Sequence, residues 1–317
     1  MNTEILDAIN FEDSSIKQAL DWLRNGYPVA FPTETVYGIG AGIYDTYAVE
    51  KVFKIKGRDF RNPLSAHISR LEDALELCLD IPDEFYMIAE KFLPGPISIV
   101  MKKKNSVPDI VTGGGNTISI RYPDNNVFLK MAGLFVQPIA ATSANRSGRP
   151  SPTSAADVFD DLTGLIPAII DTGTCKYQIE STVISLADKK VELIRPGAIP
   201  QSAIKAVIGK EILSRNRQII LKEDYKSSLN ATKLNIECFD NLEKIYEFAN
   251  LNTNKKILIM AFDTSIINSS CDITKTDELT FFSTLRKAEK ESYDFLLVLV
   301  DDYVRSSEVL SHRLRIS

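Results

Sequence analysis

Two polar segments, each following an apolar run, contain the residue types that bind charged small molecules. The first, Pro32–Gly40, carries hydroxyls, a carboxylate and two glycines that allow close backbone approach. The second, Pro138–Thr153, holds hydroxyls, an amide and two arginines. Hydroxyl, amide and backbone N–H groups hydrogen-bond phosphate and ribose oxygens, and arginine supplies charge. Ligands bind at strand ends in open α/β sheets, so both segments are candidate binding loops, although each also fits an ordinary polar turn.

A basic segment lies between these two. Five Lys and Arg side chains fall within Lys51–Arg61, in a chain whose net charge is −5. Lys56 and Arg58 flank a glycine at an expected helix end, where cations complement the helix dipole. The same side chains are suited to hold a triphosphate. His67, at the end of the apolar run Leu64–Ile68, is either a satisfied core or rim residue or a ligand contact.

Three further segments place polar side chains at or near strand ends. Alternation within Thr117–Arg121 puts Thr117, Ser119 and Arg121 on one strand face. Glu180–Thr182 precedes an apolar strand, and Arg195–Gly197 follows another. The Thr117 strand face is either a solvated surface or one wall of a cleft.

Other kinds of catalytic motif are absent from the sequence. It contains no GxxxxGK[ST] phosphate loop, no GxGxxG fingerprint, no HExxH zinc pair and no GxSxG nucleophile motif. The four cysteines lie far apart without paired spacing, which argues against a zinc site and a disulfide framework. None of these motifs therefore accounts for the polar segments.

Composition is that of a globular protein. The hydrophobic share is 44% and the charged share 25% over 317 residues, a length that favours one large domain plus a smaller one. No apolar run approaches the roughly 20 residues that span a bilayer, so we expect a cytoplasmic protein that does not enter the membrane. The acidic net charge argues against broad adhesion to nucleic acid, because such binding depends on neutralising many phosphates.

The first two thirds of the chain alternate strand-length apolar runs with segments of helical period, which predicts an α/β layered domain over 1–208. A helix is expected from Ser14 or Ser15 to Gly26. Strands are expected at 28–31, 64–68, 97–101, 117–121, 138–141, 167–171, 182–186 and 191–195, and further helices at 44–55, 71–79, 83–92, 125–132, 154–162 and 201–208.

The remaining chain predicts a linker and a second, smaller unit. Residues 209–233 are polar and weakly periodic, despite the short apolar run Ile219–Leu221, which indicates a linker. Over 234–317 the pattern is strand (234–239), helix (241–250), strand (257–261), helix (277–290), strand (295–300) and helix (304–312). That alternation predicts a small parallel, Rossmann-like α/β domain.

Taken together, the segments resemble the YrdC-domain family of L-threonylcarbamoyladenylate synthases in its longer two-domain form. The resemblance covers about residues 14–208 and rests on six motifs in the family's order and spacing. They are Pro32–Gly40; Lys56-Gly57-Arg58 with Asn62-Pro63-Leu64 and His67; Thr117 with Arg121; Ser143-Ala144-Asn145 with Arg149–Thr153; Glu180–Thr182; and Arg195–Gly197.

The resemblance implies a twisted open mixed sheet enclosing a large, basic, concave cavity. The activity it implies is condensation of L-threonine, bicarbonate and ATP to threonylcarbamoyl-AMP and pyrophosphate, for threonylcarbamoyladenosine modification of tRNA. By matching positions, Thr35, His67, Arg121, Ala141 and Ser181 would hold threonine. ATP would be held by Lys56, Arg58, Asn62, Thr117, Ser143, Asn145, Ser151, Arg195 and Tyr225. Of these, Lys56, Arg58, Ser143 and Asn145 are the residues expected to carry the catalytic step.

The residue types suit that chemistry. A guanidinium such as that of Arg121 can pair with a carboxylate through two parallel hydrogen bonds. Forming an N-carboxy group and then an adenylate depends on positioning and charge neutralisation, not on a reactive side chain. Mg²⁺ is expected to arrive with ATP and to have few protein ligands. The implied partners are the small-molecule substrates and an enzyme that transfers the threonylcarbamoyl group to tRNA, with weak or no direct tRNA binding.

Two departures and two alternatives qualify this reading. Gln178 stands where the family tends to have glycine, which would narrow the local wall, and only Tyr225-Lys226 remains of a linker stretch that covers the cavity in the family. One alternative is an RNA-binding module that uses the basic cavity without chemistry. The other is a relative that adenylates a carbamoyl group, but such relatives usually carry zinc-finger parts, and this chain has no CxxC pair.

Overall fold

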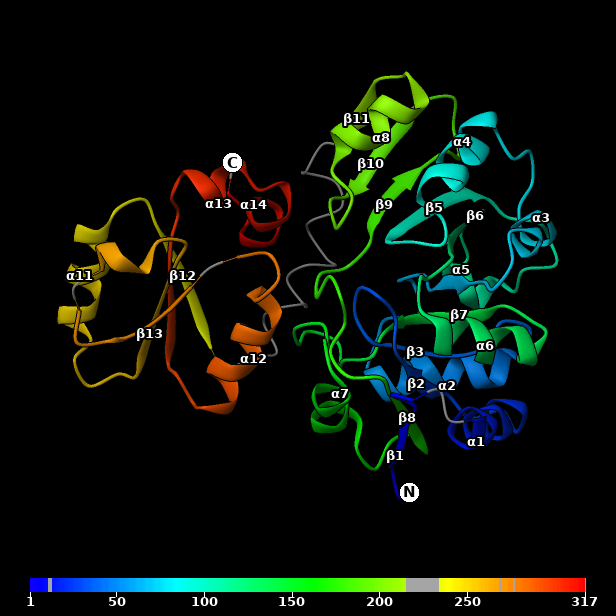
Figure 1. The fold of residues 1–317 in the computed structure, drawn as a ribbon, viewed down its shortest axis with the longest axis horizontal. Coiled ribbons are helices and arrows are strands. Elements are labelled where there is room, and N and C mark those ends of the chain that lie inside the picture. Colours follow the sequence, from blue (N-terminus) through cyan, green and yellow to red (C-terminus); the bar gives the residue numbers. More distant parts are fainter. Residues whose placement is uncertain (11–12, 215–233, 268, 276, 317) are drawn as a thin grey trace. The chain divides into compact units, whose positions relative to one another are not determined.

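The structure is a computed structural model that describes residues 1–10, 13–214, 234–267, 269–275 and 277–316. The chain forms two compact units (Figure 1). Unit 1 comprises Met1–Ser147 with Ser151–Asp224, and unit 2 comprises Gly148–Pro150 with Tyr225–Ser317. The predicted domain boundaries at 208 and 234 remain predictions.

Unit 1 is built on one sheet of eleven strands, in the order β1-β8-β2-β3-β7-β4-β6-β5-β9-β10-β11. Neighbours are both parallel, as in β4 and β6, and antiparallel, as in β5 and β6. The predicted mixed sheet is therefore confirmed. The strands are β1 (Glu4–Asp7), β2 (Val29–Phe31), β3 (Gly38–Gly42), β4 (Ser65–His67), β5 (Ile97–Lys102), β6 (Thr117–Arg121), β7 (Ile139–Ser143), β8 (Ala168–Asp171), β9 (Thr182–Ser185), β10 (Val191–Arg195) and β11 (Ile212–Ser214).

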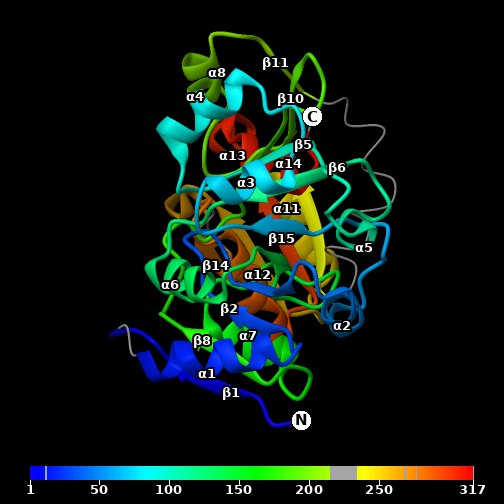
Figure 2. The same cartoon turned by 90° about the vertical axis from the view of Figure 1, so that its right-hand side faces the viewer.

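Helices cover both faces of this sheet. Successive strand residues point to opposite sides, so buried strands present apolar side chains on both faces. The helices α1 (Asp13–Arg24) and α6 (Asn126–Phe135) lie on one face (Figures 1 and 2). Val29 and Phe31 of β2 belong to the hydrophobic cluster that these helices form with the sheet. Ala30 belongs to the larger cluster on the other face. The helices that contribute to that cluster are α2 (Thr46–Lys56), α3 (Glu72–Leu77), α4 (Asp83–Phe92), α5 (Asp109–Thr112), α7 (Ala155–Leu162) and α8 (Gln201–Ile208).

Local sequence signals explain where the helices begin and end. The Asp45 carboxylate accepts a hydrogen bond from the backbone N–H of Ala48 at the start of α2, and Gly57 ends that helix in the left-handed conformation. At the start of α7, Ser154 and Asp157 form a reciprocal capping box. Each predicted helix of unit 1 is present, with bounds that shift by a few residues.

The strand β3 was not predicted, because its first residues fall in the segment Pro32–Gly40, which the sequence indicates as a candidate binding loop. Its residues, GIGAG, look like loop sequence, yet β3 pairs antiparallel with both β2 and β7. Glycine is required at position 40 because a Cβ there would lie 2.5 Å from Cγ2 of Ile139. The short elements β1, α5 and β11 were also not predicted, and β11 lies within the stretch predicted as a linker. The run Ile219–Leu221 and Tyr225 lie outside the described residues.

Unit 2 contains a parallel sheet of four strands in the order β12-β15-β13-β14, which confirms the predicted small parallel sheet. Its elements are β12 (Asn235–Phe239), α11 (Leu242–Leu251), β13 (Ile257–Ala261), the 3₁₀ helix η1 (Thr264–Ile266), β14 (Asp272–Lys275), α12 (Phe281–Lys290), β15 (Phe295–Leu299), α13 (Asp302–Ser306) and α14 (Glu308–Leu314). The sequence did not predict β14, whose residues DITK are mostly polar.

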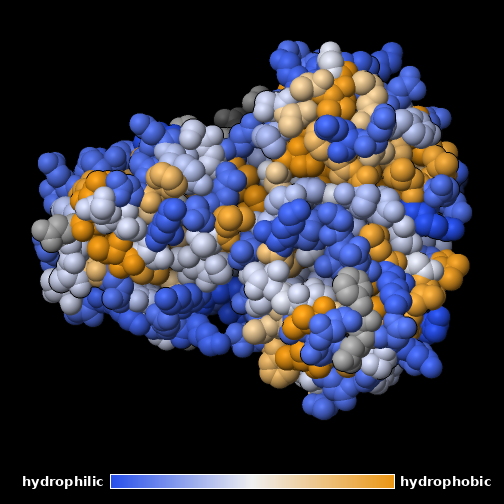
Figure 3. Space-filling view, in the orientation of Figure 1, coloured by the Kyte–Doolittle hydropathy of each residue, from blue (hydrophilic) through white to orange (hydrophobic). Residues whose placement is uncertain are grey.

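The surface mixes polar and apolar residues. On the face in Figure 3, hydrophobic surface gathers over the part of unit 1 that carries α3 and α4, where Leu75, Leu79 and Tyr86 are exposed. Within the described residues, no helix combines the length and apolar character that crossing a membrane requires.

Candidate functional site

The sheet order of unit 1 brings several predicted site residues together. Strand β6 pairs with β4 and β5, so Arg121 lies directly across from His67 on one side and Ser98 on the other. Strand β5 also pairs with β9, which begins immediately after Ser181. These side chains are distant in sequence and are assembled only by strand pairing.

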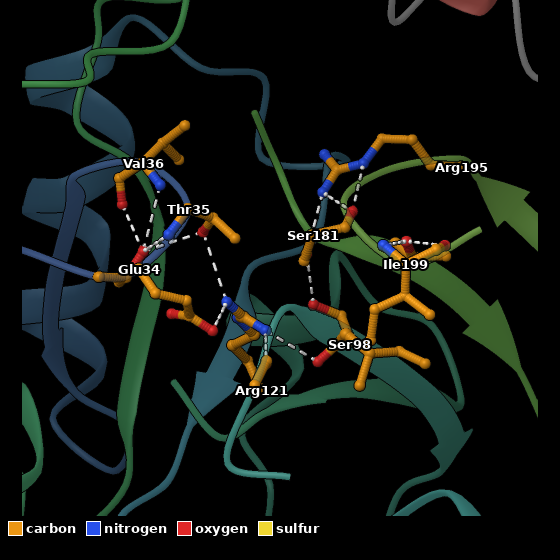
Figure 4. Close-up of polar contacts among 12 residues, drawn as sticks. Glu34, Thr35, Val36, Ser98, Arg121, Ser181, Arg195 and Ile199 are labelled. Carbon is orange, nitrogen blue, oxygen red and sulfur yellow. Dashed lines mark hydrogen bonds and ion pairs between the residues drawn. The ribbon is translucent and has the colours of Figure 1, made fainter. Parts of the chain in front are cut away.

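The loop after β2 is a tight turn closed by its own hydroxyls (Figure 4). The Thr33 hydroxyl accepts hydrogen bonds from the backbone N–H groups of Thr35 (3.1 Å) and Val36 (3.2 Å) and donates to the carbonyl of Val36 (2.6 Å). It also lies 2.9 Å from the Thr35 hydroxyl. Thr33, Glu34 and Thr35 are all buried, so this turn forms a fixed inner wall and not a solvated loop.

A buried ion pair joins that turn to β6. Nη2 of Arg121 lies 2.7 Å from Oε1 of Glu34 and 3.4 Å from the Thr35 hydroxyl (Figure 4). Nη1 donates to the carbonyls of Gly95 and of Ile97, the latter at 3.1 Å. Burial lowers the pKa of Arg121, while the negative charge of Glu34 opposes that shift. The Arg121 guanidinium is therefore held on two sides by protein acceptors.

A second arginine, Arg195, forms hydrogen bonds with the turn before β9. Arg195 donates to the carbonyl of Ser181 from Nε (3.2 Å) and Nη2 (2.8 Å), and Nη2 also lies 3.1 Å from the Ser181 hydroxyl. That hydroxyl is 2.8 Å from the hydroxyl of Ser98 (Figure 4). Gly197 permits the close approach, since a Cβ there would lie 2.4 Å from the carbonyl oxygen of Glu180.

His67 is a buried, neutral residue. Its ring packs edge-on against Phe31 and Phe128, with centroid separations of 5.8 and 5.9 Å. Burial and the nearby charge of Arg121 lower the pKa of His67 to about 3. At neutral pH the imidazole is therefore an uncharged hydrogen-bonding group and not a proton acceptor.

The Lys56 ammonium is the centre of a second polar cluster. The Lys56 side chain is 2% exposed, and its ammonium donates to the carbonyls of Ser143 and Asn145. It also lies 3.3 Å from Oδ1 of Asn145, which accepts a hydrogen bond from the Ser143 hydroxyl at 2.6 Å. The ammonium thus fixes the loop that follows β7 and keeps a positive charge beneath it.

The other predicted residues that the structure describes make further contacts or lie within strands of unit 1. Arg58 donates to the carbonyls of Asn62 and Pro63, both at 3.0 Å, and so orders the loop that contains Asn62. The Ser151 hydroxyl donates to Glu180 at 2.8 Å. Ala141 is buried in β7 opposite Ser65, and Thr117 is half-buried at the start of β6.

Two residues of the cluster around Arg121 and Ser181 had no role assigned from the sequence. Glu34 was noted only as the carboxylate of its segment, yet it forms the ion pair with Arg121. Ser98 stands in the strand sequence ISIVMK, where a single buried serine among apolar residues was the available signal. Gln178 adopts a left-handed conformation with φ of 52°.

The fold and these clusters define an α/β protein in which a mixed sheet assembles buried arginines, hydroxyls and a carboxylate at its strand ends. The chain belongs to the Sua5/YciO/YrdC family, described as telomere recombination, whose sequence profile matches residues 21–197.

Two curated relatives of this chain are named threonylcarbamoyl-AMP synthase. It is 46% identical over 199 residues to threonylcarbamoyl-AMP synthase of Pyrococcus abyssi, covering 63% of this chain and 58% of that one. It is 41% identical over 207 residues to threonylcarbamoyl-AMP synthase of Bacillus subtilis, covering 65% and 60%. The matches therefore span less than two thirds of these curated relatives.

A solved structure matches over both units of the chain. The crystal structure of P. abyssi Sua5 complexed with L-threonine has a TM-score of 0.84 and 32% sequence identity, covering 99% of this chain and 98% of that one.

Proposed function

We propose that this protein is a threonylcarbamoyl-AMP synthase, which condenses L-threonine, bicarbonate and ATP and releases pyrophosphate. The observation that carries the proposal is the buried cluster of Arg121, Glu34, Thr35 and Ser181, which offers one guanidinium and several hydroxyls to a small polar ligand. The P. abyssi relative solved with L-threonine shares this fold.

Threonine would be held by Thr35, His67, Arg121, Ser181 and the backbone of Ala141. The guanidinium suits its carboxylate, and hydroxyls together with a neutral imidazole suit its hydroxyl. A site that hydrogen-bonds this hydroxyl rejects analogues that lack it, because its buried polar groups would then be unpaired.

ATP would be held by residues from several segments, including the Lys56 cluster. The residues proposed for this role are Lys56, Arg58, Asn62, Thr117, Ser143, Asn145, Ser151, Arg195 and Tyr225. Mg²⁺ would accompany the phosphates and neutralise their charge. Among the described residues, no group of three or more His, Cys, Asp or Glu is placed to hold a metal ion.

The chemistry is catalysis by placement. The uncharged threonine amine adds to CO₂ and loses a proton, or attacks bicarbonate and releases water, to form N-carboxythreonine. The new carboxylate then attacks the α-phosphate of ATP and displaces pyrophosphate. The side chains of the site bind, orient and neutralise charge, and none of them has to form a covalent bond. Because the adenylate is an activated carbamate, we propose that the product passes to an enzyme that transfers the threonylcarbamoyl group to tRNA.

A direct assay tests the proposal. Purified protein is incubated with radiolabelled threonine, bicarbonate, Mg²⁺ and ATP, and the product is separated by chromatography. We expect labelled threonylcarbamoyl-AMP and an equal amount of pyrophosphate, both dependent on bicarbonate. Absence of this adenylate under every condition would reject the enzyme. Salt-sensitive RNA binding without product would favour the RNA-binding alternative instead.

One variant tests the assignment of ATP. We expect Arg58→Ala to lower kcat/KM by at least about 100-fold, because it removes a charge-assisted contact and loosens the loop that Arg58 holds through Asn62 and Pro63. Arg24→Ala, an exposed arginine on α1, is the matched control and should keep wild-type activity. Undiminished activity in Arg58→Ala would remove Arg58 from the site.

A further inference from the structure

The Glu34–Arg121 ion pair is almost completely shielded from solvent. The side chains of Arg121 and Glu34 are 3% and 2% exposed, and the nitrogen and oxygen lie 2.7 Å apart. Buried charges carry a large desolvation cost, so such a pair persists where geometry is good or where function needs it. The pair lies beside Thr35, within the cluster proposed to hold threonine.

Arg121 has one guanidinium nitrogen left for a ligand. Nη1 donates to the carbonyls of Gly95 and Ile97, and Nη2 donates to Glu34 and Thr35. Within the described part of the chain, no acceptor contacts Nε of Arg121. A threonine carboxylate that met Arg121 in this orientation would find Nε as the remaining donor, which allows one hydrogen bond and not the two parallel bonds expected from the sequence. The other contacts fix the direction in which this N–H points.

Glu34 is held through its backbone, and within the described residues its side chain makes one polar contact, to Arg121. Its carbonyl accepts from the backbone N–H of Tyr177 at 2.8 Å, and the Thr33 hydroxyl closes the turn around it. Within the described residues, Oε2 of Glu34 is buried and has no hydrogen-bond partner. The Glu34 carboxylate therefore acts on its surroundings through Oε1, which contacts Arg121.

The electrostatic arrangement points the same way. Arg195 is close enough for its positive charge to lower the pKa of Arg121 further. Glu34 opposes this effect more strongly than the other nearby carboxylate, Asp124, so its loss would leave the positive charge of Arg121 less well compensated. Glu34 therefore both orients Arg121 and stabilises its positive charge in this buried position.

Resting on the proposed function, we propose that Glu34 is a positioning residue for threonine binding. It holds Nη2 of Arg121, and with the carbonyls of Gly95 and Ile97 it directs the guanidinium toward the substrate carboxylate. Glu34 acts through Arg121 and does not itself contact the substrate.

Two substitutions separate charge from geometry. Glu34→Gln keeps the length of the side chain and an acceptor oxygen but removes the charge. Glu34→Asp keeps the charge but withdraws the carboxylate by about 1.5 Å, the length of one C–C bond. We expect both variants to raise the KM for threonine roughly 10- to 100-fold, the range for losing a hydrogen bond between charged groups. The KM for ATP should stay within about twofold of the wild-type value.

The matched control is Glu211→Gln, which neutralises an exposed carboxylate paired with Lys205 at 2.6 Å. It should leave both KM values unchanged. Threonine binding is also measured by calorimetry without ATP, so that affinity is known apart from turnover. If Glu34→Gln does not fold, Glu34→Asp decides the question, because it preserves the charge balance of the core.

The outcomes distinguish this inference from the proposed function. A rise in threonine KM and dissociation constant, with ATP KM unaffected, supports the positioning role. Unchanged threonine affinity in both variants, or equal rises for threonine and ATP, overturns it while leaving the enzyme assignment intact. Wild-type protein that binds threonine but makes no adenylate refutes the proposed function, and calorimetry on the variants still decides the role of Glu34.

Discussion

His67 makes the stability of unit 1 depend on pH. Its imidazole is enclosed by Phe31 and Phe128 and lies across from Arg121, so adding a proton means burying a second cation beside the first. These surroundings lower the pKa of His67 from 6.5 to about 3, while the carbonyl of Ser65, at 3.4 Å from Nδ1, opposes the shift only weakly.

The sign and size follow from linkage. Between pH 6.5 and 3 the unfolded chain takes up a proton at His67 that the folded chain does not, so stability falls as pH falls. At pH 5, about 1.5 units below the unfolded pKa, protonation of His67 stabilises the unfolded state. At 1.36 kcal/mol per unit, this lowers the free energy of unfolding by about 2 kcal/mol. Above pH 6.5 His67 is neutral in both states and causes no loss of stability. The loss of about 2 kcal/mol at pH 5 requires only that the pKa of His67 in the folded protein lie well below 5.

The assay uses the single tryptophan of the chain. Trp22 packs in the same cluster as Phe31 and Phe128, so its fluorescence reports unfolding of unit 1 around His67. Urea unfolding is followed at pH 7.5 and pH 5 for the wild type, for His67→Gln and for the control His312→Gln. We expect the loss of stability between the two pH values to be about 2 kcal/mol smaller in His67→Gln than in the other two proteins.

Equal pH dependence in His67→Gln and the wild type would refute this reasoning. Imidazole resonances give a second check, because the chain has only two histidines. The His67 signal should keep its neutral position at pH 5. A midpoint near 6.5 would show that the ring is not confined by its aromatic neighbours.

Three further substitutions test other parts of the site. Lys56→Met should destabilise unit 1 by about 3–5 kcal/mol, measured by urea unfolding, because it strips a buried cation from the carbonyls of Ser143 and Asn145; a loss below about 1 kcal/mol would contradict this. Ser98→Ala should raise the KM for threonine about 3- to 10-fold, since it removes the partner of the Ser181 hydroxyl, and an unchanged KM would count against that contact. Gln178→Gly should stabilise the fold by about 0.5–1 kcal/mol, because φ is 52° there; Gln178→Ala, which keeps a Cβ, should bring no such gain.

Much of the fold was predictable because local signals agree with tertiary structure. The strands β6 and β10 have the predicted bounds, since each is a short alternating or apolar run between turn residues. The strand β3 was missed because its glycines look like loop residues. They are needed there because β2 and β7 approach closely on either side, and sequence pattern does not reveal that crowding.

The site divides in the same way. The types and order of Thr35, Lys56, Ser143 and Arg195 were visible in the sequence because polar groups at strand ends stand out from apolar runs. The partners of these residues were not. Nothing local shows that Lys56 reaches the carbonyl of Asn145, because the two residues are 89 positions apart.

The sequence by itself determined that unit 1 is an α/β domain carrying a basic, hydroxyl-rich set of strand ends, because periodicity and residue chemistry are local properties. Tertiary structure alone decided how these groups are used. Strand order placed Arg121 between His67 and Ser98 and brought Glu34 to its guanidinium. Burial then made the imidazole neutral and the ion pair solvent-shielded, since both effects depend on what surrounds a side chain in space.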